Sequence, residues 1–190
     1  MTHQEWMRNS FKDFSLSFGF HFAPKGEIEQ RMSRVRAGMV KSGIEALLVL
    51  QKMDFYYLSG TTQDGLLFLP LEGKPLLMIR RELERARIET PIEDVVALTS
   101  SREIATLVKS HLGRLPETLG FELDVLPVRD YFRYQELLKG TRFVDASPIF
   151  RHVRKIKSPF EINFMKMAGD IGRRVYHEGK KILREGMTEI

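Results

Sequence analysis

Cysteine is missing from all 190 residues of this chain. Its absence excludes a disulfide scaffold, a thiol nucleophile and any zinc or iron–sulfur site built on thiolates, so a metal would have to bind His, Asp and Glu. No apolar run approaches the ~18 residues that a bilayer-spanning helix needs, and we expect no membrane-spanning segment. What is present is 43% hydrophobic and 29% charged residues, a composition typical of one soluble globular domain.

Familiar catalytic motifs are lacking as well. The five histidines show neither HxH nor HExxH spacing, and the chain contains no GxSxG, P-loop or GxGxxG sequence. Paired carboxylates cannot be recognised from spacing alone. The residues by themselves therefore predict a globular domain and name no active site.

Net charge is +5, and the excess lies at one end of the chain. Residues 1–150 are neutral overall, whereas residues 151–190 carry ten basic and five acidic side chains. No glycine–aromatic motif for single-stranded nucleic acid accompanies this charge. We therefore predict a solvated or domain-facing helix rather than a phosphate-binding patch, and no nucleic-acid partner.

Residues 1–26 differ from the rest in their aromatic content. Met7, Phe11, Phe14 and Phe18 follow helical spacing, but charged residues interrupt the apolar pattern and no small-residue cleavage site follows. We predict an aromatic-rich extension that packs on the domain or at a subunit contact. The alternative, an interfacial membrane helix, lacks a basic face. Without cysteine or an export signal, a cytoplasmic protein is expected.

Residues 27–152 alternate between helical and strand-like patterns, which predicts an α/β domain with a mixed β-sheet flanked by helices on both faces. Glu72-Gly73 is a hairpin signal between two of the strands. Helices are predicted at 27–42, 81–88, 102–112 and 128–138, and strands at 45–50, 65–71, 74–80, 95–98, 118–122 and 142–145.

Residues 153–190 are predicted to form a linker and one long helix. Ser158-Pro-Phe-Glu161 is a capping-box sequence with Pro at the first helical position, and the helix should run to about Arg184, before Gly186. An apolar stripe follows it, formed by Ile162, Met165, Ala168, Ile171, Val175, Gly179 and Ile182. Nothing after the helix would cover this stripe, so we expect the helix to begin a further domain.

The segment 53–64 is the strongest candidate for a ligand crevice. It follows the first buried strand and combines aromatic residues with a Gly and hydroxyl-rich loop. The candidate cleft residues are Asp54, Tyr56, Tyr57, Thr61 and Asp64. The alternative is a short helical turn that buries Phe55 and Leu58 and a flexible loop after it.

Several stretches resemble the N-terminal domain of the creatinase, prolidase and Xaa-Pro aminopeptidase family, whose catalytic half has the pita-bread metallopeptidase fold. Asp54-Phe-Tyr-Tyr-Leu-Ser-Gly60 is similar to N-x-x-Y-L-T-G, and Leu119-Gly-Phe-Glu122 is similar to I-G-x-E. Arg154-Lys-Ile-Lys-Ser-Pro-Phe-Glu-Ile162 resembles R-x-I-K-S-P-x-E-I. The resemblance spans 27–190 and implies a ribonuclease H-like fold, although Asp54 replaces the usual Asn and Ser59 the usual Thr.

The resemblance also implies a function. The chain would be the non-catalytic N-terminal domain of an Xaa-Pro dipeptidase or aminopeptidase that shapes the substrate cleft and mediates homodimerisation. Two divalent ions (Mn, Co or Zn) would bind two Asp, one His and two Glu in a catalytic domain beyond Ile190, so this chain would contain no catalytic or metal-binding residue and be inactive alone. The substrate would be a short proline-containing peptide, with Tyr56 and Tyr57 stacking on its ring and Asp54 or Asp64 binding its amine.

One alternative belongs to a different functional class. Histone chaperones contain a related peptidase-like domain without metals, which would make the chain a peptide- or protein-binding module. Whether the whole protein is an enzyme depends on the metal ligands of the other half. Other members of the family hydrolyse creatine or other small substrates, so the reaction is also open.

Overall fold

The computed structural model describes residues 22–188, in two compact units divided between Val153 and Arg154. The predicted aromatic helix and most of the predicted extension lie outside the described residues. The helices are α2 (Lys25–Ser42), α3 (Lys52–Ser59), α4 (Leu83–Glu89), η1 (Ser101–Glu103), α5 (Ile104–Leu112), α6 (Val128–Leu137), α7 (Ser147–Lys155) and α8 (Pro159–Ile182). The strands are β1 (Ala46–Val49), β2 (Gly65–Pro70), β3 (Leu76–Ile79), β4 (Asp94–Ala97), β5 (Thr118–Phe121) and β6 (Arg142–Asp145).

The six strands form one mixed sheet in the order β4-β3-β2-β1-β5-β6. Within the described chain, β2 alone runs antiparallel to its neighbours: its Phe68 lies opposite Leu48 of β1, and its Leu67 lies opposite Leu77 of β3. The remaining neighbours pair in parallel. Gly73, with a φ of 99°, lies in the β2–β3 turn, so the predicted hairpin is confirmed. As a result, β1, β3, β4, β5 and β6 end at the same edge of the sheet.

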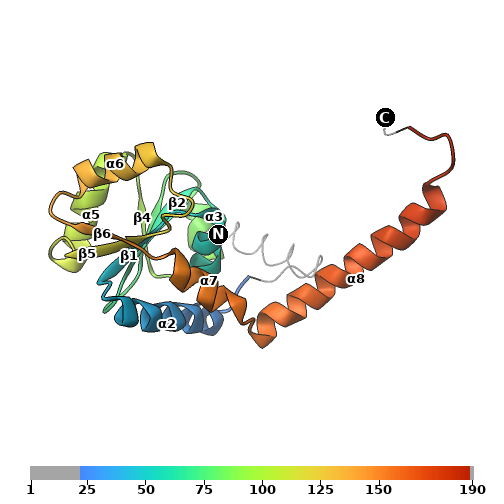
Figure 1. Ribbon diagram of the computed structural model, residues 1–190, viewed down its shortest axis with the longest axis horizontal. Coiled ribbons are helices and arrows are strands. Elements are labelled where there is room, and N and C mark those ends of the chain that lie inside the picture. Colours follow the sequence, from blue (N-terminus) through green and yellow to red (C-terminus); the bar gives the residue numbers. More distant parts are fainter. Residues whose placement is uncertain (1–21, 189–190) are drawn as a thin grey trace, which may run out of the picture. The chain divides into compact units, whose positions relative to one another are not determined.

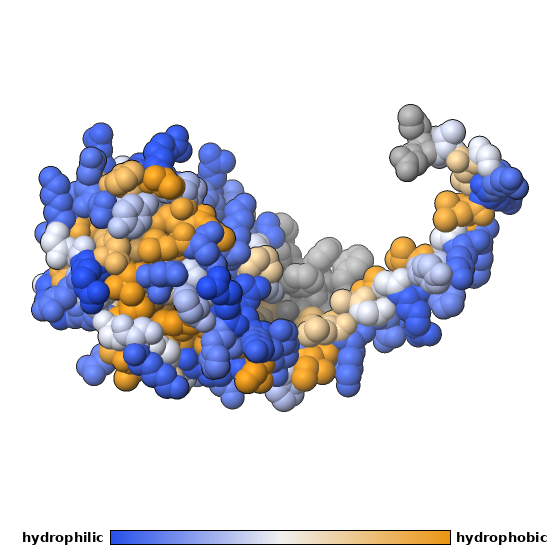
Figure 2. All heavy atoms as spheres, in the orientation of Figure 1, coloured by the Kyte–Doolittle hydropathy of each residue, from blue (hydrophilic) through white to orange (hydrophobic). Residues whose placement is uncertain are grey.

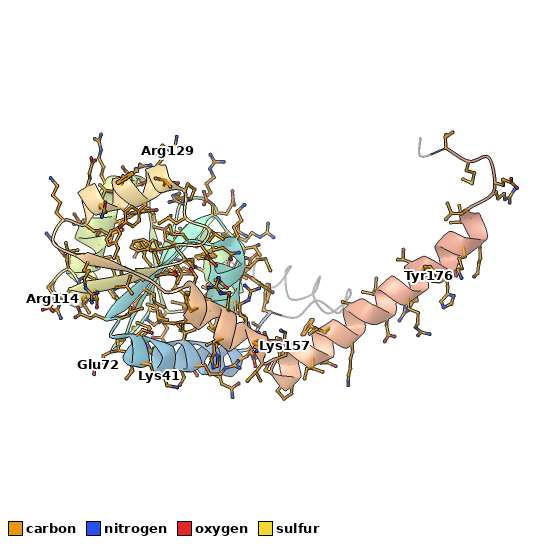
Figure 3. All side chains as sticks on the ribbon, in the orientation of Figure 1. Lys41, Glu72, Arg114, Arg129, Lys157 and Tyr176 are labelled. Atoms are coloured by element: carbon orange, nitrogen blue, oxygen red, sulfur yellow. The ribbon has the colours of Figure 1, made fainter. Side chains whose placement is uncertain are left out.

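Helices cover both faces of this sheet, as predicted (Figure 1). Alternate strand residues, among them Leu48, Phe68 and Phe121, form the core with α5 and α6. On the other face α2 buries Met32 and Val35. Figure 3 shows this division, with Arg129 of α6 and Lys41 of α2 pointing outward on opposite sides of the domain.

Helix α7 begins after the strand predicted at 142–145 and runs into the start of the linker predicted from residue 153, where no helix was predicted. Its first turn is fixed by Asp145, whose Oδ1 accepts hydrogen bonds from the Ser147 amide at 2.9 Å and its hydroxyl at 2.5 Å. Pro148 is compatible with a first helical turn, where its missing N–H has no intrahelical partner to lose. Ile149 and Phe150 are buried, and Ile149 packs on Gly38 of α2. No helix was predicted here, because this helix is short and its burial depends on contacts with α2.

Helix α8 confirms the predicted long helix and its capping box. The Ser158 hydroxyl accepts from the Glu161 amide at 3.2 Å, while Glu161 accepts from the Ser158 amide at 2.8 Å. The helix has 24 residues, all described, and none of them is buried. Orange spheres along the helix in Figure 2 mark its apolar side chains, and Ile171 and Val175 are among the exposed ones. Across residues 22–188, no helix combines the length and hydrophobicity that crossing a bilayer requires.

Candidate functional site

Segment 53–64 folds as helix α3 and a closed loop. Gln51 begins the helix by accepting a hydrogen bond from the Asp54 amide at 2.8 Å, and Gly60 ends it in the left-handed region with a φ of 76°. Phe55 and Leu58 are buried. The helical turn that the sequence analysis weighed as the alternative is therefore present.

Tyr57 points into the domain and contacts α2. Its hydroxyl accepts from Arg34 at 3.2 Å, its carbonyl accepts from Arg31 at 3.0 Å, and the Arg31 guanidinium lies 4.4 Å from its ring centroid. Arg31 is itself paired with Glu27 at 2.9 Å. These contacts hold the ring in a buried cation–π arrangement.

Thr61 is fully buried in a polar network that fixes the loop after α3. Its hydroxyl donates to Glu89 at 2.6 Å, and Gln63 and Arg85 donate to the same carboxylate at 3.1 and 2.7 Å. Glu89 lies on α4, 28 residues further along the chain. Two donors of the loop thus meet one buried carboxylate, which Arg85 of the same helix α4 also pairs with, and hydrogen bonds to a charged acceptor are the stronger kind.

Asp64 lies at the start of β2 and remains accessible. Its carboxylate pairs with Arg80 at 3.2 Å, and its side chain is 53% exposed. Tyr56 is also exposed, whereas Asp54, Tyr57 and Thr61 are buried. The structure thus places the five predicted residues in one segment but presents only Tyr56 and Asp64 at the surface, and their roles stay predictions.

A cavity of about 280 Å³ lies at the sheet edge where β1, β3 and β5 end. Glu122 follows β5 directly and is 2% exposed. One of its oxygens accepts from the Leu50 amide at 3.1 Å, and burial together with the nearby Asp54 raises the pKa of the carboxyl to about 8. Glu122 was not among the predicted site residues, although an acid that ends an apolar strand is a sequence signal for a special role.

A second cavity, of about 350 Å³, opens near the start of α2 and the β2–β3 turn. Ile28 and Met32 contribute apolar surface to it. At its rim Glu93 pairs with Lys25 at 3.4 Å and with Lys74 at 2.8 Å. Because these charges satisfy one another at an exposed position, they provide little binding energy for a ligand.

We searched the described part of the chain for side chains that could bind a metal ion. No group of three or more His, Cys, Asp or Glu side chains comes together there in a way that could hold a metal ion.

Comparison with known proteins supplies the family. The model of the creatinase/prolidase N-terminal domain matches residues 31–156, which is more than half of the chain. The chain belongs to the creatinase/prolidase N-terminal domain family. The predicted boundary between the domain at 27–152 and the linker and helix at 153–190 remains a prediction. It lies close to residue 156, where the family match ends.

Curated relatives of this family domain are hydrolases about twice as long as the chain. The uncharacterized hydrolase/peptidase y4tM of Sinorhizobium fredii is 27% identical over 190 residues, which cover 89% of this chain and 48% of the relative. The ectoine hydrolase of Halomonas elongata is 27% identical over 189 residues, which cover 86% of the chain and 46% of that protein. The chain thus spans about half the length of the curated relatives it matches.

Solved structures share the fold of this creatinase/prolidase N-terminal domain. The Xaa-Pro dipeptidase from Bacillus anthracis superposes with a TM-score of 0.76 at 23% identity, covering 85% of this chain and 45% of that one. The N-terminal domain of cytoplasmic peptidase PepQ from Mycobacterium tuberculosis H37Rv gives 0.58 at 24% identity, covering 65% of this chain and 98% of that one. The mixed sheet and its helices are therefore the fold of the prolidase N-terminal domain.

Proposed function

We propose that this chain is the N-terminal, non-catalytic part of a metal-dependent Xaa-Pro dipeptidase or aminopeptidase. The observation on which this depends most is the family match over residues 31–156, in a chain about half as long as its hydrolase relatives. Helix α8 supports it, because a capped 24-residue helix without a buried residue needs a partner for its apolar stripe. In this proposal α8 begins the catalytic domain, whose residues would hold two divalent ions (Mn, Co or Zn).

The role proposed for the α/β domain is to narrow the substrate cleft and to mediate homodimerisation. Tyr56 and Asp64 are the accessible members of the predicted set, so they are the residues that would meet a short proline-containing peptide. The network around Glu89 supports this role, because it holds the loop between them in one conformation. A cytoplasmic location is part of the proposal, as in the PepQ neighbour's description.

A second candidate substrate is a small cyclic amidine such as ectoine rather than a peptide. The observation that favours it is the ectoine hydrolase, which matches the chain at the same 27% identity as y4tM. The binding-module alternative related to histone chaperones has less support, because the curated relatives are described as hydrolases.

The test begins with the intact mass of the protein in its source cells. We expect about twice the 22.1 kDa of this chain. The purified full-length protein, loaded with Mn²⁺, is then assayed with Xaa-Pro dipeptides and with ectoine. Hydrolysis of the dipeptides supports the proposal. Hydrolysis of ectoine alone would identify a cyclic amidine, rather than a peptide, as the substrate. A mass near 22.1 kDa contradicts the proposal.

The contribution of the domain is tested by Tyr56→Ala and Asp64→Ala in the full-length enzyme. We expect each to raise KM for the dipeptide by about tenfold, the loss of roughly 1.4 kcal/mol of binding energy. Met53→Ala is the matched control, because Met53 is exposed on the same helix. Unchanged KM in both variants would show that the loop does not touch the substrate.

A further inference from the structure

The cavity beside Glu122 lies where the connections of two neighbouring parallel strands separate. β1 and β5 pair in parallel, with Ala46 opposite Leu119. The chain leaves β1 into α3, which contacts α2 on one face, whereas it leaves β5 toward α6, whose Tyr134 packs in the core of the other face. Such a separation leaves a crevice outside the carboxyl ends of the strands, and in open α/β sheets this is where ligands bind.

The lining of this cavity combines both signs of charge with an apolar wall. Arg80 contributes a guanidinium from the end of β3, Asp130 contributes a carboxylate from the first turn of α6, and Tyr134 contributes a hydroxyl. The apolar wall is formed by Leu50, Val125, Leu126 and Pro127. A ligand that fits this lining has a cation, an anion and a short aliphatic body.

Glu122 supplies the feature that indicates a missing partner. It lines the cavity and is 2% exposed. Its Oε2 accepts from the Leu50 amide, and the backbone amides of Gln51 and Glu122 also favour the ionised carboxyl, but within residues 22–188 its buried Oε1 has no partner at hydrogen-bond distance and angle. A buried polar atom without a partner costs about 1–3 kcal/mol, so native proteins retain such atoms where a ligand or water completes them.

Arg80 has donors left for a ligand. One guanidinium nitrogen pairs with Asp64 at 3.2 Å, and the Tyr134 hydroxyl also interacts with the guanidinium. Arginine carries five N–H donors in a planar fork, and carboxylates are its best-matched partners.

We propose that this cavity binds a small aliphatic α-amino acid, with its carboxylate on Arg80 and Tyr134 and its ammonium group on Glu122 and Asp130. The aliphatic side chain would lie against Leu50. The site is independent of the peptidase proposal, because it needs no residue outside the described chain.

The pH dependence of binding follows from the groups around Glu122. These are Asp54 of α3, Arg80 at the end of β3, and Asp130 and Tyr134 of α6. Burial and Asp54 hold the pKa of Glu122 at about 8, so the carboxyl is protonated at pH 6.5 in the free protein. An ammonium group favours the ionised carboxylate, so affinity for the amino acid rises between pH 6.5 and 8.5.

The experiment is calorimetric titration of the 190-residue chain with L-valine at both pH values. Isovalerate, which is valine without its amine, and isobutylamine, which is valine without its carboxylate, are titrated in parallel. We expect L-valine to bind at least about tenfold more tightly than either analogue, about 1.4 kcal/mol for each lost charge contact. No valine binding, or isovalerate binding as tightly as valine, would overturn the proposal.

Substitutions in the cavity test the contacts proposed for the amino acid. Glu122→Gln and Arg80→Met should each weaken valine binding by at least about tenfold, and Glu122→Gln should also remove the rise with pH. Glu136→Gln and Arg81→Met are the matched controls, because both residues are exposed and do not line the cavity. Tyr134→Phe, which removes only a hydroxyl, tests the site if Glu122→Gln does not fold. Equal losses in the control variants would contradict a specific site.

Discussion

Helices α2 and α8 are both amphipathic, yet one is a buried element of the domain and the other is exposed along its whole length. α2 spans 18 residues and buries Ile28, Met32, Val35 and Met39 against the sheet. α8 spans 24 residues, all of them described, and buries none. The two sequences show the same 3.6-residue pattern, so the pattern identifies the face that needs cover but not what covers it.

The two helices are also stabilised by different interactions. Its capping box satisfies two backbone amides at the N-terminus, and its length allows the hydrogen-bond ladder to propagate. α2 has no side-chain cap at its N-terminus and depends on tertiary packing instead. Stability should therefore respond differently to substitutions in the packed domain and in α8.

The largest contrast is expected for apolar truncations. Phe68 on β2 is fully buried, and Phe68→Ala should lower the free energy of unfolding by about 3–5 kcal/mol. Ile171→Ala in α8 should change it by less than about 0.5 kcal/mol, because Ile171 is 60% exposed. Chemical denaturation of the 190-residue chain measures both. A loss of several kcal/mol in Ile171→Ala would show that α8 is buried in solution.

A second contrast concerns two glutamates and pH. The pKa of Glu122 is raised to about 8 in the folded chain. Between pH 4.5 and 8 the folded chain therefore keeps a proton on this carboxyl that the unfolded chain has released. Stability should therefore fall as pH rises from about 4.5, the ordinary value, through about 8, by at most roughly 1.4 kcal/mol per pH unit.

Glu122→Gln should remove this slope between pH 6 and 8, whereas Glu178→Gln in α8 should leave it unchanged. Glu178 is exposed and pairs with Lys181 at 2.6 Å on the helix surface, a contact of little energetic value. Denaturation midpoints at several pH values provide the measurement. Parallel profiles for Glu122→Gln and the wild type would mean that Glu122 is ionised in the folded domain.

The sequence predicted the fold well because strand and helix periodicities are local. The β2–β3 hairpin and the capping box at Ser158 each depend on a few adjacent residues. Helix α7 was missed, since it is short and its burial involves a distant helix, with Ile149 packed on Gly38 of α2. Local signals therefore sufficed where the neighbours are close in sequence.

The candidate site was less predictable for the same reason. The Thr61 hydroxyl donates a hydrogen bond to Glu89 of α4, 28 residues away, and Tyr57 is held by Arg31 and Arg34 of α2. The cavity beside Glu122 is assembled from the ends of β1, β3 and β5 and from α6. Periodicity contains no information on which strand ends become neighbours.

The smallest contrast is between two glycines, and here the predicted effects have opposite signs. A Cβ on Gly120 of β5 would lie 2.5 Å from Leu47 Cδ2 and 3.0 Å from the Ala146 side chain. Gly120→Ala should therefore cost about 1–3 kcal/mol through overpacking. A Cβ on Gly172 of α8 meets nothing within 4 Å, leaving out the helix's own nearby backbone.

Gly172→Ala should instead stabilise α8 by about 0.5–1 kcal/mol, because alanine loses less backbone entropy than glycine in a helix. Thermal unfolding reports the loss in Gly120→Ala, and the far-ultraviolet helix signal together with amide exchange along α8 reports the gain in Gly172→Ala. The same substitution is thus decided by packing in one region and by intrinsic helix propensity in the other. If Gly172→Ala proved destabilising, a close neighbour of that face of α8 would have to exist in solution, and the helix would be covered as α2 is.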